Sequence, residues 1–205
     1  MKNKLMIFLT GMLIASIPVL AQENADSLAV VSSKKFIAAF KRLQQEGEVA
    51  QQRQDSIDKV AKERCKPGTP MFNFQYQDVD GHAVSLKDLK GKYVFIDVWA
   101  TWCGPCCAEI PYLQKLEKLF SKKKIVFVSI SVDNNTGTWK RMVKEKQLGG
   151  IQLNYGGNSR LLDEFGITGI PRFILLDKKG RIVNARMTRP SDEATEKTLS
   201  GLKGI

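Results

Sequence analysis

Two near-continuous apolar runs stand out in the second half of the chain, at residues 93–100 and 125–132. Runs of this length, rich in β-branched and aromatic residues, are typical of strands buried on both faces of a sheet. Between them, apolar residues recur every three or four positions from Cys106 to Phe120, which predicts a helix with one apolar face. The order strand, helix, strand predicts a parallel βαβ unit with a right-handed crossover.

Shorter elements are expected on both sides of this unit. Aromatic and polar side chains alternate over residues 72–76, and with the turn at 78–81 and the apolar pair at 83–84 they predict a small hairpin. The other expected elements are helices at 138–146 and 159–165, strands at 173–176 and 182–185, and a last helix from Ser191. The pattern therefore predicts an α/β domain with the element order β-β-β-α-β-α-α-β-β-α.

Residues 22–67 are polar and helix-prone, and they predict a helical arm ahead of the domain. Phe36, Phe40 and Leu43 are spaced four and three apart and so share one helical face, while Gly47 is expected to break the helix. This apolar stripe is too narrow for a core of its own. Three roles for the arm stay open: docking on the domain, pairing with another chain, or spacing the domain from a membrane. The Pro/Gly-rich stretch that follows places the start of the domain, 68–205, near Gly68.

The first 21 residues have the order of a secretory signal peptide. Lys2 and Lys4 precede an apolar run that ends near Leu20, and cleavage is expected after Ala21. The run is shorter than the ~20 residues that a membrane-spanning helix needs. We therefore expect an exported protein, periplasmic in a Gram-negative host, with an uncleaved N-terminal anchor as the alternative.

Composition changes this picture little. The chain has 205 residues, of which 43% are hydrophobic, so it is long and apolar enough for one ordinary globular domain and is not disordered throughout. The net charge of +11 is scattered along the chain except at residues 122–124, where three lysines follow an expected helix. Cations at a helix C-terminus are favoured by the helix dipole, so we expect no nucleic-acid partner.

The candidate chemistry lies at the end of the first buried strand. Cys103 and Cys106 are separated by two residues where a strand meets a helix, and this arrangement is typical of redox-active dithiols. Free N–H groups and the dipole of the first helical turn stabilise a thiolate on Cys103, and Cys106 lies close enough to close a disulfide. A zinc site would need four ligands, and beyond this pair the chain offers only Cys65, Cys107 and His82. We therefore expect no metal and no cofactor, and an inert structural disulfide is the alternative.

Residues 68–205 resemble the exported TlpA/ResA-like branch of the thioredoxin superfamily. The resemblance rests on three segments: the Trp-Cys-Gly-Pro-Cys motif at 102–106, the Ala-Glu-Ile-Pro sequence at 108–111 and the Gly-Ile-Pro sequence at 169–171. It implies a thioredoxin fold with an AhpC/TSA-redoxin-like domain, in which helices flank a central mixed β-sheet that begins with a β-hairpin. The preceding arm lies outside the resemblance.

The resemblance also implies a role for each motif residue. Cys103 would be the attacking nucleophile and Cys106 the resolving thiol that releases the mixed disulfide. Trp102 would shield the pair. Pro171 would be a cis proline that faces the dithiol, and the backbone of Ile170 would bind an extended substrate segment.

Two carboxylates are candidates for proton chemistry. Asp97 lies within the buried strand six residues before Cys103, and burial would raise its pKa toward the working pH, as a general base for the resolving thiol requires. A pairing of Asp97 with Lys92 or Lys115 at the sheet edge is the alternative. Glu109 resembles the acidic residue that this branch keeps near its dithiol, and we interpret it as a tuner of the thiol pKa values rather than a solvated helix charge.

The resemblance implies an oxidoreductase that reduces protein disulfides, because Gly-Pro between the cysteines and Ile before the proline are similar to reducing thioredoxins. Such an enzyme would maintain cell redox homeostasis or support cytochrome c maturation, with apocytochrome c among the candidate substrates. In an oxidising compartment it would need a membrane thiol electron donor of the DsbD/CcdA type.

Two alternatives to this function remain. A thiol peroxidase shares the fold, but peroxiredoxins carry a Thr three residues before the reactive cysteine, and Ala100 stands there. A non-catalytic binding module with a structural disulfide is the second alternative. The roles of Cys65 and Cys107 stay open, and a bridge between them or an intermolecular disulfide through Cys65 is considered.

Overall fold

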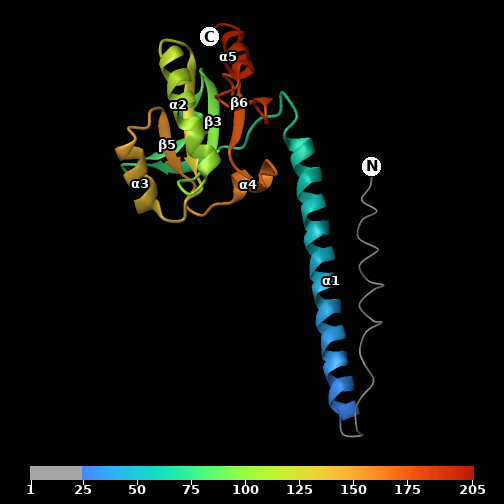
Figure 1. The fold of residues 1–205 in the computed structure, drawn as a ribbon. Coiled ribbons are helices and arrows are strands. Elements are labelled where there is room, and N and C mark those ends of the chain that lie inside the picture. The colour runs from blue at the N-terminus through green and yellow to red at the C-terminus, as the bar shows by residue number, and fades with distance from the viewer. Residues whose placement is uncertain (1–24) are drawn as a thin grey trace. The chain divides into compact units, whose positions relative to one another are not determined.

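The computed structural model describes residues 25–205, so the predicted signal peptide lies outside the described residues. The chain divides into two compact units, one that ends at Arg53 and one that spans Gln54–Ile205 (Figure 1). Within residues 25–205, no helix is both long enough and apolar enough to cross a membrane.

The arm is one helix, α1 (Ala25–Arg64), and the expected break at Gly47 is wrong. A glycine costs an exposed helix interior only about 1 kcal/mol relative to alanine, and the long polar helix formers around it outweigh that cost. Phe36, Phe40 and Leu43 are exposed, as are the other large apolar side chains before Arg53 that the structure describes. The last turns of α1, from Gln54 on, belong to the second unit.

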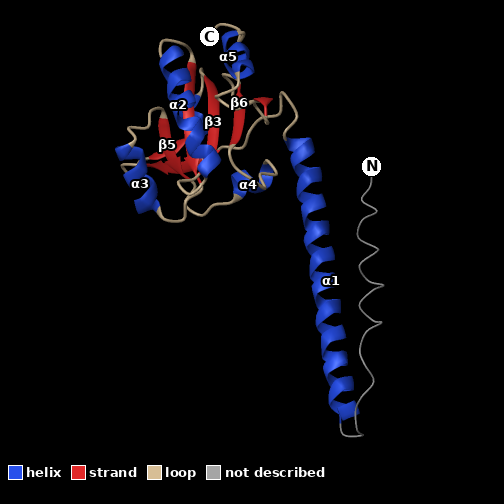
Figure 2. Ribbon diagram, viewed as in Figure 1, coloured by secondary structure: helices blue, strands red, loops and turns tan. Residues whose placement is uncertain are grey.

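The second unit is built on a seven-stranded mixed sheet with the strand order β2-β1-β5-β4-β3-β6-β7 (Figure 2). The strands are β1 (Gln75–Asp78), β2 (Ala83–Ser85), β3 (Tyr93–Trp99), β4 (Ile125–Ser131), β5 (Ile151–Asn154), β6 (Arg172–Leu176) and β7 (Ile182–Asn184). β3, β4 and β5 are parallel neighbours, and the other pairs are antiparallel. The predicted βαβ unit is confirmed with β3 and β4 at the centre of the sheet.

Helices cover both faces of this sheet. They are η1 (Leu86–Leu89, a 3₁₀ helix), α2 (Gly104–Leu119), α3 (Thr136–Glu145), α4 (Arg160–Glu164) and α5 (Glu193–Ser200). Apolar side chains of α2 and α5 form one core with Phe95 and Leu175, whereas η1 and α4 form the other core with Ile96 and Leu176. Neighbouring residues of β3 and of β6 thus enter opposite cores, which explains why both strands are apolar at almost every position.

The sequence pattern misses one strand, β5, and begins the hairpin too early. β5 has only four residues and is flanked by the glycine pairs at 149–150 and 156–157, so it resembles a loop. Its place comes from pairing with β4 on one side and with β1 on the other. β1 starts at Gln75, so Phe72 and Phe74 precede it and only Tyr76 of the aromatic residues that predicted it lies in the strand.

Candidate active site

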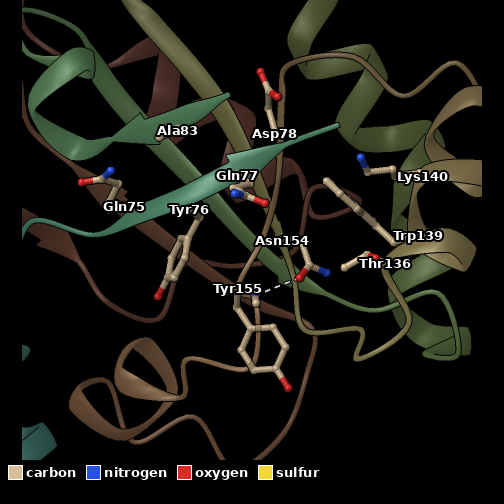
Figure 3. A pocket seen from close by; sticks show the side chains of 11 residues that line it. Gln75, Tyr76, Gln77, Asp78, Ala83, Thr136, Trp139, Lys140, Asn154 and Tyr155 are labelled. Carbon is tan, nitrogen blue, oxygen red and sulfur yellow. Dashed lines mark hydrogen bonds between the residues drawn. The ribbon is translucent and has the colours of Figure 1, made fainter. Parts of the chain in front are cut away.

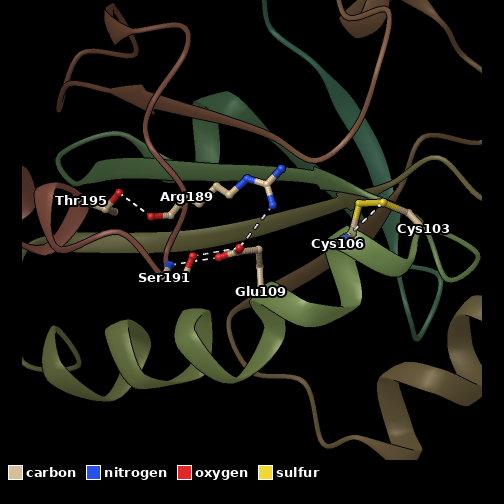
Figure 4. Close-up of polar contacts among 6 residues, drawn as sticks. All are labelled: Cys103, Cys106, Glu109, Arg189, Ser191 and Thr195. Atoms are coloured by element: carbon tan, nitrogen blue, oxygen red, sulfur yellow. Dashed lines mark hydrogen bonds and ion pairs between the residues drawn. A yellow bond between two sulfur atoms is a disulfide. The ribbon is translucent and has the colours of Figure 1, made fainter.

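The dithiol lies at the junction between β3 and α2. Cys103 and Cys106 form a disulfide with their Cα atoms 5.2 Å apart, and both side chains are buried (Figure 4). Cys103 is the N-cap of α2, and its Sγ accepts a hydrogen bond from the Cys106 N–H at 3.2 Å. After reduction, this N–H and the helix dipole favour a thiolate on Cys103 over one on Cys106.

A buried carboxylate that the sequence analysis missed fixes the turn before Cys103. Asp133 accepts hydrogen bonds from the Thr101 N–H at 2.9 Å, the Thr101 hydroxyl at 2.7 Å and the Ser131 hydroxyl at 2.7 Å. Asn154 in turn donates to the Asp133 carbonyl at 3.0 Å. The signal in the sequence was an acidic residue just after β4, because the carboxyl ends of parallel neighbours β3 and β4 lie at the same edge of the sheet.

The predicted substrate-binding residues lie beside the disulfide. The Ile170–Pro171 peptide bond is cis, as the resemblance predicts. Ile170 packs against an apolar cluster that contains Cys103, Cys106 and Trp99. Trp102 is 70% exposed, so it covers the pair less than expected and instead offers a large aromatic surface next to it.

Glu109 faces the interior, so it is not a solvated helix charge. It lies on the buried face of α2 with Cys106, Leu113 and Leu116. Its carboxylate accepts hydrogen bonds from the Ser191 N–H and hydroxyl, both at 2.9 Å, and Arg189 Nη1 lies 3.6 Å away (Figure 4). These contacts tie the first turns of α2 to the segment before α5.

Asp97 is buried in β3, and its Oδ1 has no hydrogen-bond partner. Burial raises its pKa to about 8, with smaller contributions from the charges of Glu109 and Glu117, while the Ser129 hydroxyl on β4 opposes the shift. Asp97 makes no ion pair within the described part of the chain, and Lys115 instead lies 4.0 Å from Glu196. The alternative of a lysine-paired Asp97 is therefore wrong.

Glu117, a partly buried acid, shares the surroundings of Asp97 and was not predicted. Asp97 and Glu117 line one small cavity of about 10 Å³, with Gln152 on its wall. Burial raises the pKa of Glu117 to about 7. The Glu117 carboxyl group fills the space that a side chain at Gly149 would need, which accounts for glycine there.

Cys65 and Cys107 are free thiols in the structure, with no bridge between them. The Cys107 thiol donates to the Thr101 carbonyl at 3.6 Å, and the Cys65 thiol donates to the Glu164 carbonyl at 3.8 Å. Burial raises the pKa of Cys65, so this thiol is a weaker nucleophile at neutral pH.

Other parts of the described surface offer less for catalysis. A hollow of about 370 Å³ between β1, β5 and α3 has Trp139 and Tyr155 on its walls but no thiol (Figure 3). Asp78, Asp80 and His82 gather on a turn, where the Asp78 carboxylate already accepts the N–H groups of the other two residues. The reactive chemistry is therefore centred on Cys103 and Cys106.

Comparison with known proteins agrees with this geometry. The family model described as Redoxin matches residues 66–202. The chain belongs to the Redoxin family. This Redoxin chain is 30% identical over 139 residues to the thiol-disulfide oxidoreductase ResA of Bacillus thuringiensis subsp. konkukian, a match that covers 67% of this chain and 79% of ResA.

Solved Redoxin-like structures give the same fold. A Bacteroides vulgatus protein, named as a candidate thiol-disulfide oxidoreductase, is 53% identical with a TM-score of 0.60 over 64% of this chain and 89% of its own. The thioredoxin domain of another thiol-disulfide oxidoreductase from B. vulgatus is 31% identical with a TM-score of 0.61 over 66% and 96%. The predicted thioredoxin fold is confirmed.

Proposed function

We propose that this Redoxin protein is an exported thiol-disulfide oxidoreductase that reduces protein disulfides. The observation that carries the proposal is the position of Cys103, whose sulfur caps α2 beside the cis Ile170–Pro171 bond. The names of its relatives support the reaction class, and the order of residues 1–21 supports export.

In the first step, the Cys103 thiolate attacks one sulfur of a substrate disulfide. A sulfur–sulfur bond forms between Cys103 and the substrate, the substrate disulfide breaks, and the leaving thiolate takes up a proton. The N–H of Cys106, which points at Cys103 Sγ, lowers the cost of the thiolate before the attack. The exposed ring of Trp102 provides apolar contact for the incoming segment.

In the second step, Cys106 resolves the mixed disulfide. Its thiol gives a proton to the Asp97 carboxylate, and the resulting thiolate attacks Cys103 Sγ. The bond between Cys103 and the substrate breaks, and the second substrate sulfur leaves as a thiolate that takes up a proton. Two electrons have then passed from the protein to the substrate, and the protein holds the Cys103–Cys106 disulfide. The next cycle needs two electrons from an external dithiol, for which a membrane thiol donor of the DsbD/CcdA type is the proposed source. Candidate substrates are apocytochrome c and misoxidised exported proteins. Their reduction would support cytochrome c maturation or maintain cell redox homeostasis.

A redox titration of the full chain tests the direction of electron flow. The Cys103–Cys106 pair is equilibrated in thiol buffers and followed by thiol trapping, with Cys107→Ser as the control variant and Cys103→Ser as the inactive one. A midpoint below about −230 mV supports a reductase. A midpoint near −120 mV would reassign the protein as an oxidase that introduces disulfides, and the absence of a reversible transition would leave a structural disulfide.

Export is tested by expression with and without residues 1–21, followed by cell fractionation. We expect the intact chain outside the cytoplasm and the shortened chain inside it. The same compartment for both would contradict the signal-peptide prediction.

A further inference from the structure

A shallow groove of about 370 Å³ lies between the start of β6 and the segment that leads from β7 to α5. Pro171 and Arg172 form one side, and Arg186 and Arg189 form part of the other. The Met187 N–H donates to the Phe173 carbonyl at 3.0 Å, which holds the two sides together. Pro171, at one end of the groove, directly follows Ile170, which packs against the cluster that contains both active-site cysteines.

The lining of this groove is cationic. It includes three arginines, and Asp192 is its one carboxylate. The Asp192 side chain is already engaged as the N-cap of α5, where it accepts the Ala194 N–H at 2.9 Å. With the Glu109 carboxylate 3.6 Å from Arg189 also counted, an approaching ligand meets a surface with a net excess of one positive charge.

The arginines differ in what they already bind. Arg189 lies 3.6 Å from Glu109, whereas Arg172 and Arg186 have no ion-pair partner among the residues that the structure describes. Arg172 Nη1 is buried without a hydrogen-bond partner. Burial lowers the pKa of Arg172, the positive charge of the nearby Arg186 lowers it further, and Cys65 opposes the shift.

A carboxylate in the groove would satisfy the free guanidinium donors and offset their positive charge. Guanidinium groups bind carboxylates with two parallel hydrogen bonds, and partial burial strengthens such contacts. The groove is open and continues from the cis peptide, so it suits a side chain on an extended polypeptide whose cysteine lies over Cys103.

We propose that the groove selects disulfide substrates whose cysteines are flanked by Asp or Glu, with Arg172 and Arg186 as the carboxylate-binding residues. The inference rests on the proposed function, since the acidic segment belongs to the polypeptide that Cys103 reduces. The arginines take no part in bond making, and the two-electron exchange is the one described above.

The test compares disulfide peptides that share one loop and differ only in the flanking residues, which are acidic, neutral or basic. Reduced full-length protein is mixed with an excess of each peptide, and the second-order rate constant of its single-turnover oxidation, which corresponds to kcat/KM, is measured. We expect about a tenfold preference for the acidic over the neutral peptide at low ionic strength. The preference should shrink in 0.5 M NaCl, because salt screens partly exposed charges.

Variants test whether the preference for acidic peptides comes from the groove. In the double variant Arg172→Gln/Arg186→Gln, the ratio of acidic to neutral kcat/KM should approach one. Arg141→Gln, an exposed arginine on α3, makes the same charge change elsewhere and should keep the wild-type ratio. Should the double variant fold poorly, Arg186→Gln alone is measured, because the exposed Arg186 side chain can be replaced without opening the core.

The outcomes separate this inference from the function on which it rests. Reduction of all three peptides at similar rates, or an equal preference in the groove variants and the wild type, would overturn the acidic selection and leave the reductase in place. Failure to reduce any peptide would refute the reductase, and the acidic selection with it.

Discussion

Asp97 is a carboxyl group that the fold holds at a cost in stability. Its pKa is about 8 in the folded protein, against about 4 in an unfolded chain. The folded state thus binds this proton more tightly, and the free energy of unfolding should fall as the pH rises from about 4 to about 8. Asp97→Asn removes the Asp97 part of this dependence, while the part from Glu117, whose pKa is raised to about 7, remains, and the substitution should stabilise the protein at pH 7 by on the order of 4 kcal/mol. Urea unfolding of the oxidised protein from pH 4 to pH 9 measures it.

Asp88 provides a control, because its pKa is shifted in the opposite direction from that of Asp97. It is exposed, and hydrogen bonds from the Ser85 hydroxyl and N–H lower its pKa. Asp88→Asn should therefore decrease the free energy of unfolding at neutral pH. If Asp97→Asn also destabilised the protein at pH 7, the view of Asp97 as an uncompensated buried acid would be wrong.

The proton-accepting role of Asp97 predicts a defect in one step only. With Asp97→Asn, the attack of Cys103 on a disulfide peptide should be little changed, while release of the mixed disulfide by Cys106 should slow at least tenfold at pH 8. In the wild type, the release rate should rise with pH with a midpoint near 8, where half of the Asp97 carboxyl groups are ionised, and level off at higher pH. Stopped-flow measurements with acid quenching resolve the two steps, and an equal slowing of both would contradict the assignment.

At the scale of elements, Asp133 joins the ends of β3, β4 and β5 to the turn before α2. Asp133→Ala would leave the Thr101 N–H and the Ser131 hydroxyl without their acceptor in a buried site, and we expect a loss of about 2–4 kcal/mol in unfolding free energy. Asp133→Asn keeps one acceptor oxygen and should lose less. Thermal unfolding of the two variants checks this order, and equal losses would indicate that Asp133 contributes only volume.

The hydrophobic pattern predicted the elements whose own sequence shows a clear apolar run or periodicity. β3, β4 and α2 were found within about two residues, because a doubly buried strand and an amphipathic helix each impose a pattern on local sequence. β5 was missed because it is stabilised by its neighbours rather than by its composition. The helix through Gly47 was missed because one glycine is a weak breaker among strong helix formers.

The contacts of the candidate site likewise divide into those that local sequence predicts and those that it does not. Cys103 and Cys106 lie three positions apart at the start of one helix, so their proximity follows from the local junction between β3 and α2. The contacts of Asp133 with Thr101, and of Glu109 with Ser191, join residues that are 32 and 82 positions apart. Such contacts depend on strand order and loop paths, and a hydrophobic pattern contains no information about them.

At the scale of the whole molecule, the end of the arm is part of the domain it precedes. The Redoxin match begins at residue 66, yet the compact unit begins at Gln54. Ala61 is 5% exposed, and a Cβ added at Gly166 would lie 2.8 Å from the Ala61 Cβ. Arg64 forms an ion pair of 2.9 Å with Glu164. The last turns of α1 therefore cover the core next to α4 rather than serve as a free linker.

This packing predicts that substitutions at neighbouring positions of α1 differ sharply in their effect on the free energy of unfolding. Ala61→Glu places a charge and extra volume in a closed contact and should lower the free energy of unfolding of the compact unit by about 2 kcal/mol. Val60→Glu, at a position that is 46% exposed, makes the same kind of change and should have little effect. Chemical denaturation followed by tryptophan fluorescence reports on the compact unit, because all three tryptophans lie in it. Equal behaviour of the two variants would mean that α1 ends as a spacer, and the domain would then begin after the arm.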